Sequence, residues 1–276
     1  MNPLTKSKKI GFIGAGNMAQ AMIKGMLESH LTNADHLFVS NRTPGKLKKI
    51  SENYKINICQ SNEELVEKCD IVILAVKPQD LVVAVEPIIQ IFLEKQIVIS
   101  LAAGIQMQTL EKYLPHCRVV RLMPNTPSII GRGTIGFFLN EPDEGLETLL
   151  EDLFSPLGSV MKLQDEDQFE AFMIACSSGT GFVFELMTYW QEWIEEHGFD
   201  PEVAKVMTIE TFLGASELAL KTPDLSLEEL QSRVTSKKGV TAAGLESMRE
   251  LEIERALRVS FEKAALKNKE MARIVK

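Results

Sequence analysis

Short, continuous apolar runs that alternate with amphipathic segments are the feature that most limits how this chain can fold. The run Ile71–Ala75 reads IVILA and carries no polar residue, which indicates a strand buried on both faces. The segments between the runs are long enough for crossover helices, so each strand can return parallel to the one before it. The alternation predicts a doubly wound α/β sheet. The predicted strands are Ile10–Ile13, Leu37–Val39, Ile71–Ala75, Ile97–Leu101 and Val119–Leu122, followed by Ile135–Leu139 and Ser159–Leu163. The predicted crossover helices lie near residues 17–30, 45–54, 62–69, 79–94 and 106–114.

Strand patterns stop near Asp165, and the rest of the chain has the spacing of helices. Phe169–His197 is rich in large apolar residues and ends at Gly198, which is typical of a helix C-terminus. Pro201 suits the start of the next helix, and apolar residues recur at helical spacing again near the end of the chain. We therefore predict that the second half of the chain is entirely helical.

The helical half is more apolar than a set of surface helices needs to be, and it includes Trp190 and Trp193. We predict that it buries a face against a second copy of the chain and makes a homodimer. The alternative is that these helices only cover the sheet. The predicted domains are residues 1–163, with the sheet, and residues 164–276, with the helices.

Composition and charge argue against several classes of protein. A net charge of −8 is the opposite of a nucleic-acid-binding surface. No apolar run reaches the roughly 18–20 residues of a membrane span, and the N-terminal segment lacks the layout of a secretory signal. The four cysteines lack C-x-x-C spacing and the four histidines lack metal-ligand spacing. We expect a cytoplasmic protein with free thiols, no metal, and neither nucleic acid nor membrane as a partner.

A glycine-rich turn follows the first predicted strand. The segment GFIGAGNMA fits the dinucleotide fingerprint with Gly14, Gly16 and Ala19. Gly14 makes the tight turn, Gly16 lets the backbone approach a pyrophosphate at the helix N-terminus, and Ala19 permits close packing of helix on sheet. The motif predicts a Rossmann-type domain that binds a dinucleotide, and the alternative is a glycine-rich turn without a ligand.

The end of the second predicted strand indicates which dinucleotide binds. An NAD-binding chain usually carries an acidic residue there, which binds the ribose hydroxyls. This chain has Ser40, Asn41, Arg42 and Thr43 instead. A carboxylate would repel a 2′-phosphate, whereas a guanidinium and hydroxyls bind one. The sequence therefore favours NADP(H) over NAD(H), unless Arg42 is only a solvated surface charge.

Two proline-containing turns also follow predicted strands directly. AVKPQ occupies Ala75–Gln79, and MPNTP occupies Met123–Pro127 with Asn125 between its prolines. Ligands of open α/β sheets bind outside the carboxyl ends of the strands. We expect both turns to contribute to one site, although either could be a structural turn.

Together, these segments resemble the pyrroline-5-carboxylate reductase family, which makes proline. The resemblance covers nearly the whole chain, and runs through GFIGAGNMAQAM, the asparagine of SNEEL, DIVILAVKPQ, SLAAGI, RLMPNTP, SSGTGFVF and VTSKKGVTAAGLESM. It implies reduction of a cyclic imine to L-proline with NADPH or NADH, a Rossmann domain, and a helical domain that pairs two subunits, with dimers that often assemble into rings.

The resemblance also implies residue roles. Backbone amides of the loop before Thr241 hold the substrate carboxylate, and the Thr241 hydroxyl bonds the ring nitrogen as the catalytic residue; the alternative role for Thr241 is a helix N-cap. The expected substrate-binding residues are Gly239, Val240, Thr241 and Asn125. The expected cofactor-binding residues are Gly14, Ala15, Gly16, Asn17, Met18, Asn41, Arg42, Thr43, Asn62, Ala75, Val76, Lys77, Pro78, Ala102, Ala103 and Gly104.

The chain departs from the family pattern in its helical half. Lys237-Lys238 replaces a Pro-Gly pair, and Thr180-Gly181-Phe182 replaces Pro-Ala-Tyr. Because a residue other than glycine adopts positive φ only at a cost, we expect the loop to take a different course. The departures leave two alternatives open, a reductase of another imine or small keto acid and a non-catalytic NADP-binding relative. The β-hydroxyacid dehydrogenases are disfavoured, because Phe169–Glu185 lacks the lysine they need.

Overall fold

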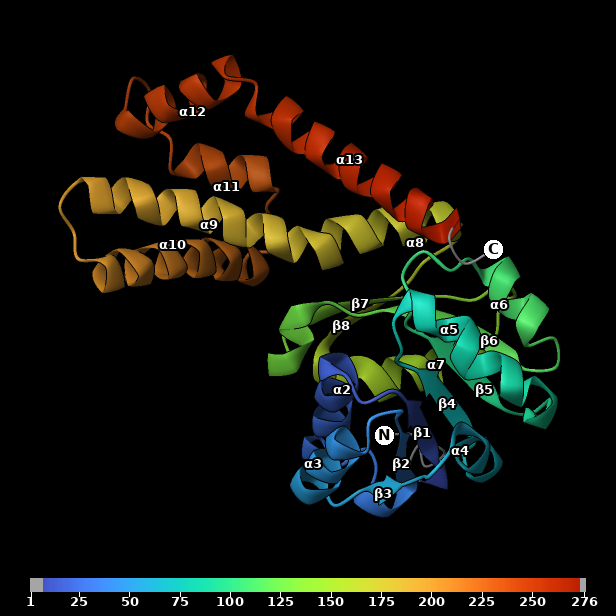
Figure 1. The fold of residues 1–276 in the computed structure, drawn as a ribbon. Helices are drawn as coiled ribbons and strands as arrows, with labels where there is room; N and C mark the ends of the chain where they lie inside the picture. The colour runs from blue at the N-terminus through green and yellow to red at the C-terminus, as the bar shows by residue number, and fades with distance from the viewer. Residues whose placement is uncertain (1–6, 274–276) are drawn as a thin grey trace. The chain divides into compact units, whose positions relative to one another are not determined.

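The chain folds into two compact units. The computed structural model describes residues 7–273 (Figure 1). One unit comprises the described residues up to Thr180 together with those from Ala264 onward, and the other is Gly181–Lys263. The units thus group the first turns of a long helix with the sheet. The predicted boundary between a sheet domain and a helical domain, between residues 163 and 164, stays a prediction.

The first unit is built on a single eight-stranded sheet, with the order β3-β2-β1-β4-β5-β6-β7-β8 in the described part of the chain. All seven predicted strands are present. β3 was not predicted, because two residues are too few to show a period. The first six strands are parallel, β7 is antiparallel to β6, and β8 is parallel to β7. The strands are β1 Ile10–Ile13, β2 Leu37–Ser40, β3 Asn57–Ile58, β4 Ile71–Leu74, β5 Ile97–Ser100, β6 Arg118–Met123, β7 Gly133–Phe138 and β8 Gly158–Lys162.

Helices cover both faces of this sheet, which explains its continuous apolar strands. In β4, Ile71 and Ile73 pack into one core with α2, α3 and α7, whereas Val72 and Leu74 pack into a second core with α4, α5 and α6. Alternate residues of a strand point to opposite faces, so a strand covered on both faces needs apolar residues throughout. The helices are α2 Asn17–Glu28, α3 Pro44–Tyr54, α4 Asn62–Lys68, α5 Pro78–Val85, α6 Met107–Tyr113 and α7 Glu144–Phe154, with short 3-10 turns η1 Ala34–His36, η2 Glu86–Ile91, η3 Thr126–Ile130 and η4 Ser155–Leu157.

A long helical run follows β8. It consists of α8 (Glu166–Phe172), a π-helical turn η5 (Met173–Ser178) and α9 (Gly179–Glu196). The whole run, Glu166–Glu196, is long and apolar enough to cross a membrane by length and composition. The expectation that no segment reaches that length is therefore wrong, although one such helix is weak evidence for a membrane span.

All secondary structure in the second unit is helical, as the sequence predicted. They are α9, α10 (Pro201–Lys221), α11 (Leu227–Arg233), α12 (Val240–Glu250) and α13 (Ile253–Arg273), the last of which continues into the first unit. Gly198 has a left-handed φ of 86° and Pro201 opens α10, so both predicted helix boundaries are confirmed. α9 and α10 lie side by side (Figure 1), with the Trp190 and Phe212 rings edge to face at 5.5 Å.

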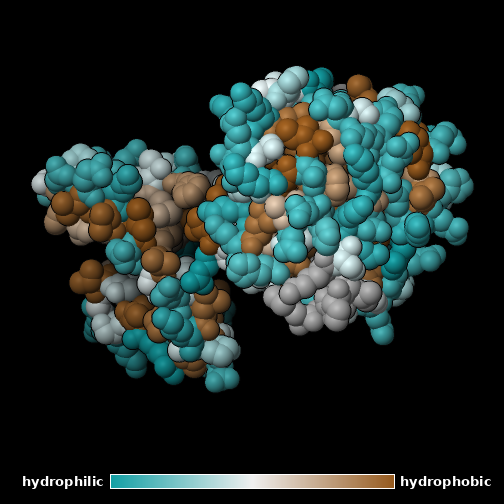
Figure 2. Space-filling model, turned by 90° about the horizontal axis from the view of Figure 1, so that it is seen from below, coloured by the Kyte–Doolittle hydropathy of each residue, from teal (hydrophilic) through white to brown (hydrophobic). Residues whose placement is uncertain are grey.

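Large apolar side chains remain on the surface of this helical unit. Figure 2 shows them as brown patches. Trp193 is 61% exposed, and Ile194, the next residue, is buried. The other exposed apolar residues of the unit include Phe184, Tyr189, Trp190, Val203, Val206, Leu213, Leu218, Leu220, Leu227, Val234, Val240 and Leu251. Exposed apolar surface on this scale is typical of a protein interaction site.

Candidate functional site

A pocket of about 600 Å³ opens at the carboxyl ends of β1, β2, β3 and β4. Its walls are the turns that follow these strands and the first turns of α5. This is the edge at which open α/β sheets bind ligands. The lining residues are Ile13, Gly14, Ala15, Gly16, Ser40, Asn41, Arg42, Thr43, Lys46, Gln60, Ser61, Asn62, Ala75, Val76, Lys77, Gln79, Asp80, Val83 and Ala84.

The glycine-rich turn has the geometry that a pyrophosphate needs. Gly14 has φ 112°, and a Cβ built on it would lie 2.5 Å from the Ala75 carbonyl oxygen. Gly16 has φ −76° and is the N-cap residue of α2, which has no side-chain cap. A Cβ on Gly16 would meet no described atom within 4 Å, so the space above its backbone is open. Gly14 is thus required by the fold, whereas Gly16 leaves room for a phosphate group at the helix N-terminus.

Two asparagines tie the turns of the pocket together. Asn41 accepts a hydrogen bond from the Ala15 N–H through Oδ1 at 3.3 Å and donates through Nδ2 to the Thr43 carbonyl at 3.2 Å. Asn62 accepts from the Ser40 hydroxyl at 2.7 Å and donates to the Ala84 carbonyl at 3.2 Å. Each side chain therefore links neighbouring turns of the same pocket and fixes their spacing.

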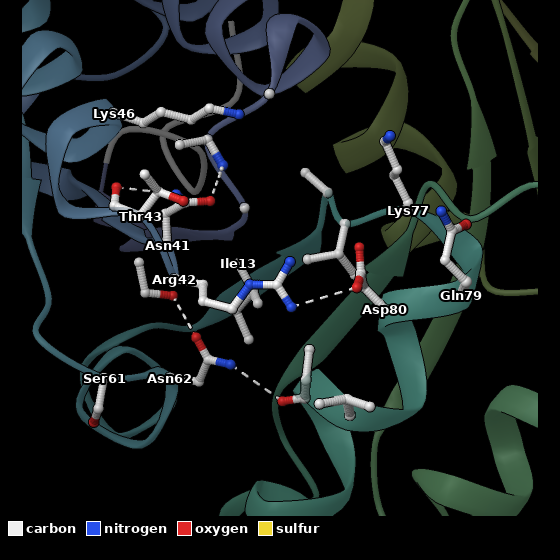
Figure 3. Close-up of a pocket in the computed structure, with 18 of the residues that line it drawn as sticks. Ile13, Asn41, Arg42, Thr43, Lys46, Ser61, Asn62, Lys77, Gln79 and Asp80 are labelled. Carbon is white, nitrogen blue, oxygen red and sulfur yellow. Dashed lines mark hydrogen bonds and ion pairs between the residues drawn. The ribbon is translucent and has the colours of Figure 1, made fainter.

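Charged side chains line several walls of the pocket. Arg42 extends from the turn after β2 toward α5, where its Nη1 lies 3.5 Å from Oδ1 of Asp80 (Figure 3). Lys46 on α3 and Lys77 at the start of α5 also line the pocket. Three cations and one carboxylate give the lining of the pocket a net positive charge, which suits a phosphorylated ligand.

The structure brings most of the predicted cofactor residues into this pocket, although binding itself stays a prediction. Those lining it are Gly14, Ala15, Gly16, Asn41, Arg42, Thr43, Asn62, Ala75, Val76 and Lys77. The others lie outside its lining. Asn17 is exposed at the start of α2, and Met18 packs against the core. Pro78 opens α5, and Ala102–Gly104 follow β5.

Sequence reasoning missed several lining residues, among them Lys46, Gln60 and Asp80. Lys46 lies in the first turn of α3, directly after the Asn41–Thr43 turn, so its position close behind that turn could have indicated it. Gln60 and Asp80 carry no comparable signal, because they belong to no motif and reach the pocket only through the packing of α4 and α5.

The amide of Asn125 bonds within the protein through both of its polar atoms. Asn125 is 7% exposed. Its Oδ1 accepts from the Thr134 N–H at 2.9 Å, and its Nδ2 donates to the Cys176 carbonyl in the π-helical turn at 3.2 Å. Next to it, the Ser177 hydroxyl donates to the Pro124 carbonyl at 3.0 Å. The Cys176 carbonyl also accepts from the Thr180 hydroxyl at 3.1 Å, so the π-helical turn is bonded both to its own helix and to the MPNTP turn.

A largely buried ion pair between Arg121 and Glu166 holds the start of α8 on β6. Arg121 of β6 is 3% exposed in its side chain and pairs with Glu166, while its guanidinium lies 3.9 Å from the centre of the Phe169 ring. Glu166 also accepts from the Met107 N–H at 2.6 Å. Burial lowers the pKa of Arg121, and the carboxylate of Glu166 opposes this effect. The pair fixes the first turn of α8 to the sheet.

The signature loop lies in the helical unit, at the N-terminus of α12. Gly239 is the N-cap residue of α12, so the alternative role of Thr241 as the N-cap is wrong; Thr241 is the second residue of the helix. The Gly239 N–H closes a turn onto the Ser236 carbonyl at 3.0 Å. Within this turn Lys238 has φ 60°.

The conformation of Lys238 shows how the altered loop folds. We expected the loop to take a different course because lysine adopts positive φ only at a cost, yet Lys238 has the left-handed conformation. Pro-Gly is well suited to a turn whose third residue has positive φ. Lys237-Lys238 keeps such a turn at a conformational cost of roughly 1–2 kcal/mol.

The described residues contain neither a metal-binding cluster nor a cysteine whose pKa is lowered. They contain no group of three or more His, Cys, Asp or Glu side chains that could hold a metal ion. Burial raises the pKa of Cys59 and of Cys117 to about 11 and also raises that of Cys176. Such thiols stay protonated at neutral pH and are poor nucleophiles.

Comparison with known families and proteins gives a consistent result. Residues 9–104 match the family described as "NADP oxidoreductase coenzyme F420-dependent". Residues 166–271 match the family described as "Pyrroline-5-carboxylate reductase dimerisation". The chain is 31% identical to pyrroline-5-carboxylate reductase 2 of Bacillus subtilis, over 96% of this chain and 95% of that protein. It is 34% identical to pyrroline-5-carboxylate reductase of Pseudomonas aeruginosa, over 93% and 96%.

Solved structures agree with this result. A pyrroline-5-carboxylate reductase from Coxiella burnetii superimposes with a TM-score of 0.85 at 32% identity, covering 98% of this chain and 99% of that one. The enzyme from Plasmodium falciparum, solved with NADP bound, gives 0.86 at 25% identity and covers 97% and 99%. The predicted fold, a Rossmann-type sheet followed by a helical domain, is confirmed. This chain belongs to the pyrroline-5-carboxylate reductase family.

Proposed function

We propose that this protein reduces 1-pyrroline-5-carboxylate to L-proline with NADPH. The observation that carries the proposal is a pocket with an open glycine turn and three cations, in a chain about one third identical to pyrroline-5-carboxylate reductases over nearly its full length. The NADP bound to the Plasmodium falciparum relative supports the choice of cofactor. When bound, NADPH supplies the hydride that reduces the carbon–nitrogen double bond.

The residues that hold the cofactor follow from the pocket. The N–H groups at the start of α2 and the open space above Gly16 would accept the pyrophosphate. Arg42 and Thr43 would hold the 2′-phosphate, because both line the pocket at the end of β2. Asn41 and Asn62 would act by fixing the turns, since their amides are already bonded within the protein.

The residues that hold the substrate lie at the start of α12. The first turn of α12 has no side-chain cap and no acidic residue. Its N–H groups would bind the substrate carboxylate, assisted by the positive end of the helix dipole. The Thr241 hydroxyl would orient the ring nitrogen, and Gly239 and Val240 would supply backbone contacts. For Asn125 we propose a positioning role through Cys176 in place of a direct bond to substrate.

The helical unit would join two copies of the chain. The apolar residues on its surface include Trp190, Trp193 and Leu220, and the family that matches residues 166–271 is described as a dimerisation domain. Burying these side chains in a homodimer would remove them from water. Sedimentation or light scattering counts the subunits, and a mass of several dimers would support a ring.

The test is the reaction itself, followed by the loss of reduced-nicotinamide absorbance with 1-pyrroline-5-carboxylate, with NADH run in parallel. We expect faster use of NADPH. Thr241→Ala should lower kcat/KM by less than the roughly 10²–10⁴-fold effect of a true general acid, and Thr241→Ser should retain most of the activity. Thr222→Ala is the matched control, because the Thr222 hydroxyl is bonded to the Leu218 carbonyl at 2.7 Å and lies outside the signature loop.

Two outcomes would contradict the proposal. If NADPH is consumed only with other imines or keto acids, the protein is a related reductase and the Lys237-Lys238 turn has changed its substrate. If NADPH binds and no substrate consumes it, the protein is a non-catalytic relative.

A further inference from the structure

The ion pair between Arg42 and Asp80 spans the pocket where the adenosine end of the cofactor would bind. Arg42 belongs to the turn after β2, and Asp80 belongs to the first turn of α5 on the facing wall (Figure 3). We propose that Asp80 competes with the 2′-phosphate for Arg42 and so limits the preference for NADPH over NADH. This inference rests on the proposed function, because it takes Arg42 as the residue that binds the phosphate.

The charges of the pocket single out Asp80. Arg42, Lys46 and Lys77 all favour an anion, and Asp80 is the only carboxylate among the described lining residues. A carboxylate beside a phosphate site has two unfavourable effects on the phosphate: it repels the anion and it occupies the guanidinium. No other described lining residue carries a negative charge that would oppose a 2′-phosphate.

The carboxylate of Asp80 has a local reason to stay where it is. It lies in the first turn of α5, and its N–H closes a turn onto the Lys77 carbonyl at 2.9 Å. An acidic side chain is stabilised at a helix N-terminus even without a cationic partner. The Asp80 carboxylate therefore stays stabilised when the Arg42 side chain moves away from it.

Arg42 is the more exposed partner of the pair. Its side chain is 82% exposed, against 36% for Asp80, and the two atoms are 3.5 Å apart. Such pairs are weak because water already solvates both charges. A 2′-phosphate offers Arg42 a doubly charged, bidentate partner and would displace the carboxylate.

The pair has a different consequence for each cofactor. A cofactor without a 2′-phosphate can bind while Arg42 stays with Asp80, so no charge loses its partner. A cofactor with the phosphate must take Arg42 away from Asp80. Breaking this ion pair offsets part of the binding free energy that the phosphate contributes. Asp80 thereby reduces the ratio of the affinity for NADPH to the affinity for NADH.

The test is Asp80→Asn in the full-length protein, with binding of two fragments measured by calorimetry. The fragments are 2′,5′-ADP, which carries the 2′-phosphate, and 5′-AMP, which lacks it. We expect Asp80→Asn to tighten 2′,5′-ADP about twofold to fivefold, the effect that an exposed ion pair can have, and to leave 5′-AMP unchanged. Glu86→Gln is the matched control, because it removes the same charge from an exposed residue just beyond α5 and outside the pocket lining.

The Arg42→Ala background separates the proposed cause from simple repulsion. If Asp80 acts by holding Arg42, most of the gain from Asp80→Asn disappears once Arg42 is gone, and only the part due to direct repulsion remains; an undiminished gain there overturns the inference. Equal tightening of both fragments, or no tightening of 2′,5′-ADP, also overturns it. If the unmodified protein binds 2′,5′-ADP no better than 5′-AMP, the proposed NADPH preference itself is wrong, which is a separate result.

Discussion

The dinucleotide pocket and the Ser236–Thr241 loop are built in opposite ways. The pocket belongs to a sheet with two buried cores, and its turns are tied together by Asn41 and Asn62. The loop is exposed, and one turn hydrogen bond holds it, with Lys238 in a left-handed conformation. The pocket therefore has the geometry of a prebuilt site, whereas the loop keeps its shape at a local conformational cost.

This difference indicates which half of the reaction the chain itself specifies. Each group that the pocket offers to a cofactor is positioned by contacts within one compact unit. The loop offers backbone N–H groups and one hydroxyl, and its two lysines face solvent. We expect substitutions in the pocket to have the larger effects on folding, and substitutions in the loop to act mainly on substrate.

The largest expected effect comes from the two glycines of the pocket. Gly14→Ala places a Cβ 2.5 Å from the Ala75 carbonyl oxygen at a φ that alanine rarely adopts, so it should lower the free energy of unfolding by about 2–4 kcal/mol and abolish cofactor binding. Gly16→Ala meets open space at an ordinary φ. It should leave stability unchanged and weaken NADP⁺ binding by about tenfold or more, because the methyl group fills the space for the pyrophosphate.

Urea unfolding and NADP⁺ titration measure the two effects on the same pair of variants. Equal loss of stability in both variants would contradict the distinction between a glycine required by the fold and a glycine required by the ligand.

An intermediate effect is expected at Asn125, which joins the MPNTP turn to the π-helical turn. Asn125→Ala leaves the Thr134 N–H and the Cys176 carbonyl without this partner, so it should cost about 1–3 kcal/mol of stability. Affinity for NADP⁺ should not change, because Asn125 is absent from the pocket lining. Asn140→Ala is the control, since Asn140 is exposed and its contact with Glu111 is long, at 3.5 Å. An Asn125→Ala variant as stable as the control would show that the amide serves a ligand and not the fold.

The smallest effect is expected in the loop. Lys238→Gly should stabilise the protein by about 0.5–1 kcal/mol, because glycine adopts positive φ without a steric penalty. Lys237→Gly removes the same charge from a neighbour that is not among the positive-φ residues, and it should give no gain. Thermal midpoints at one protein concentration compare the two. If both variants shift the midpoint equally, the effect comes from charge, and Lys238 is not strained.

The amino-acid sequence by itself determined the sheet, the helical half and the core of the pocket. Parallel strands covered on both faces must be apolar throughout, so they can be read from short runs. Gly14, Gly16, Gly198 and Pro201 act through their own backbone preferences, which depend little on distant residues. The turn residues Asn41–Thr43 and Ala75–Lys77 could be placed in the pocket because the carboxyl ends of parallel strands share one edge.

Only the tertiary structure decided the features that depend on distant partners. Cys176 in the π-helical turn bonds Asn125, which lies 51 residues away in the chain. No local hydrophobic period predicts such a turn. β3 is too short to have a pattern and exists because β2 offers it an edge. Asp80 enters the pocket through the packing of α5, and it meets Arg42 only there. Local preferences act within a few residues, whereas these contacts form only after the strands and helices have packed together.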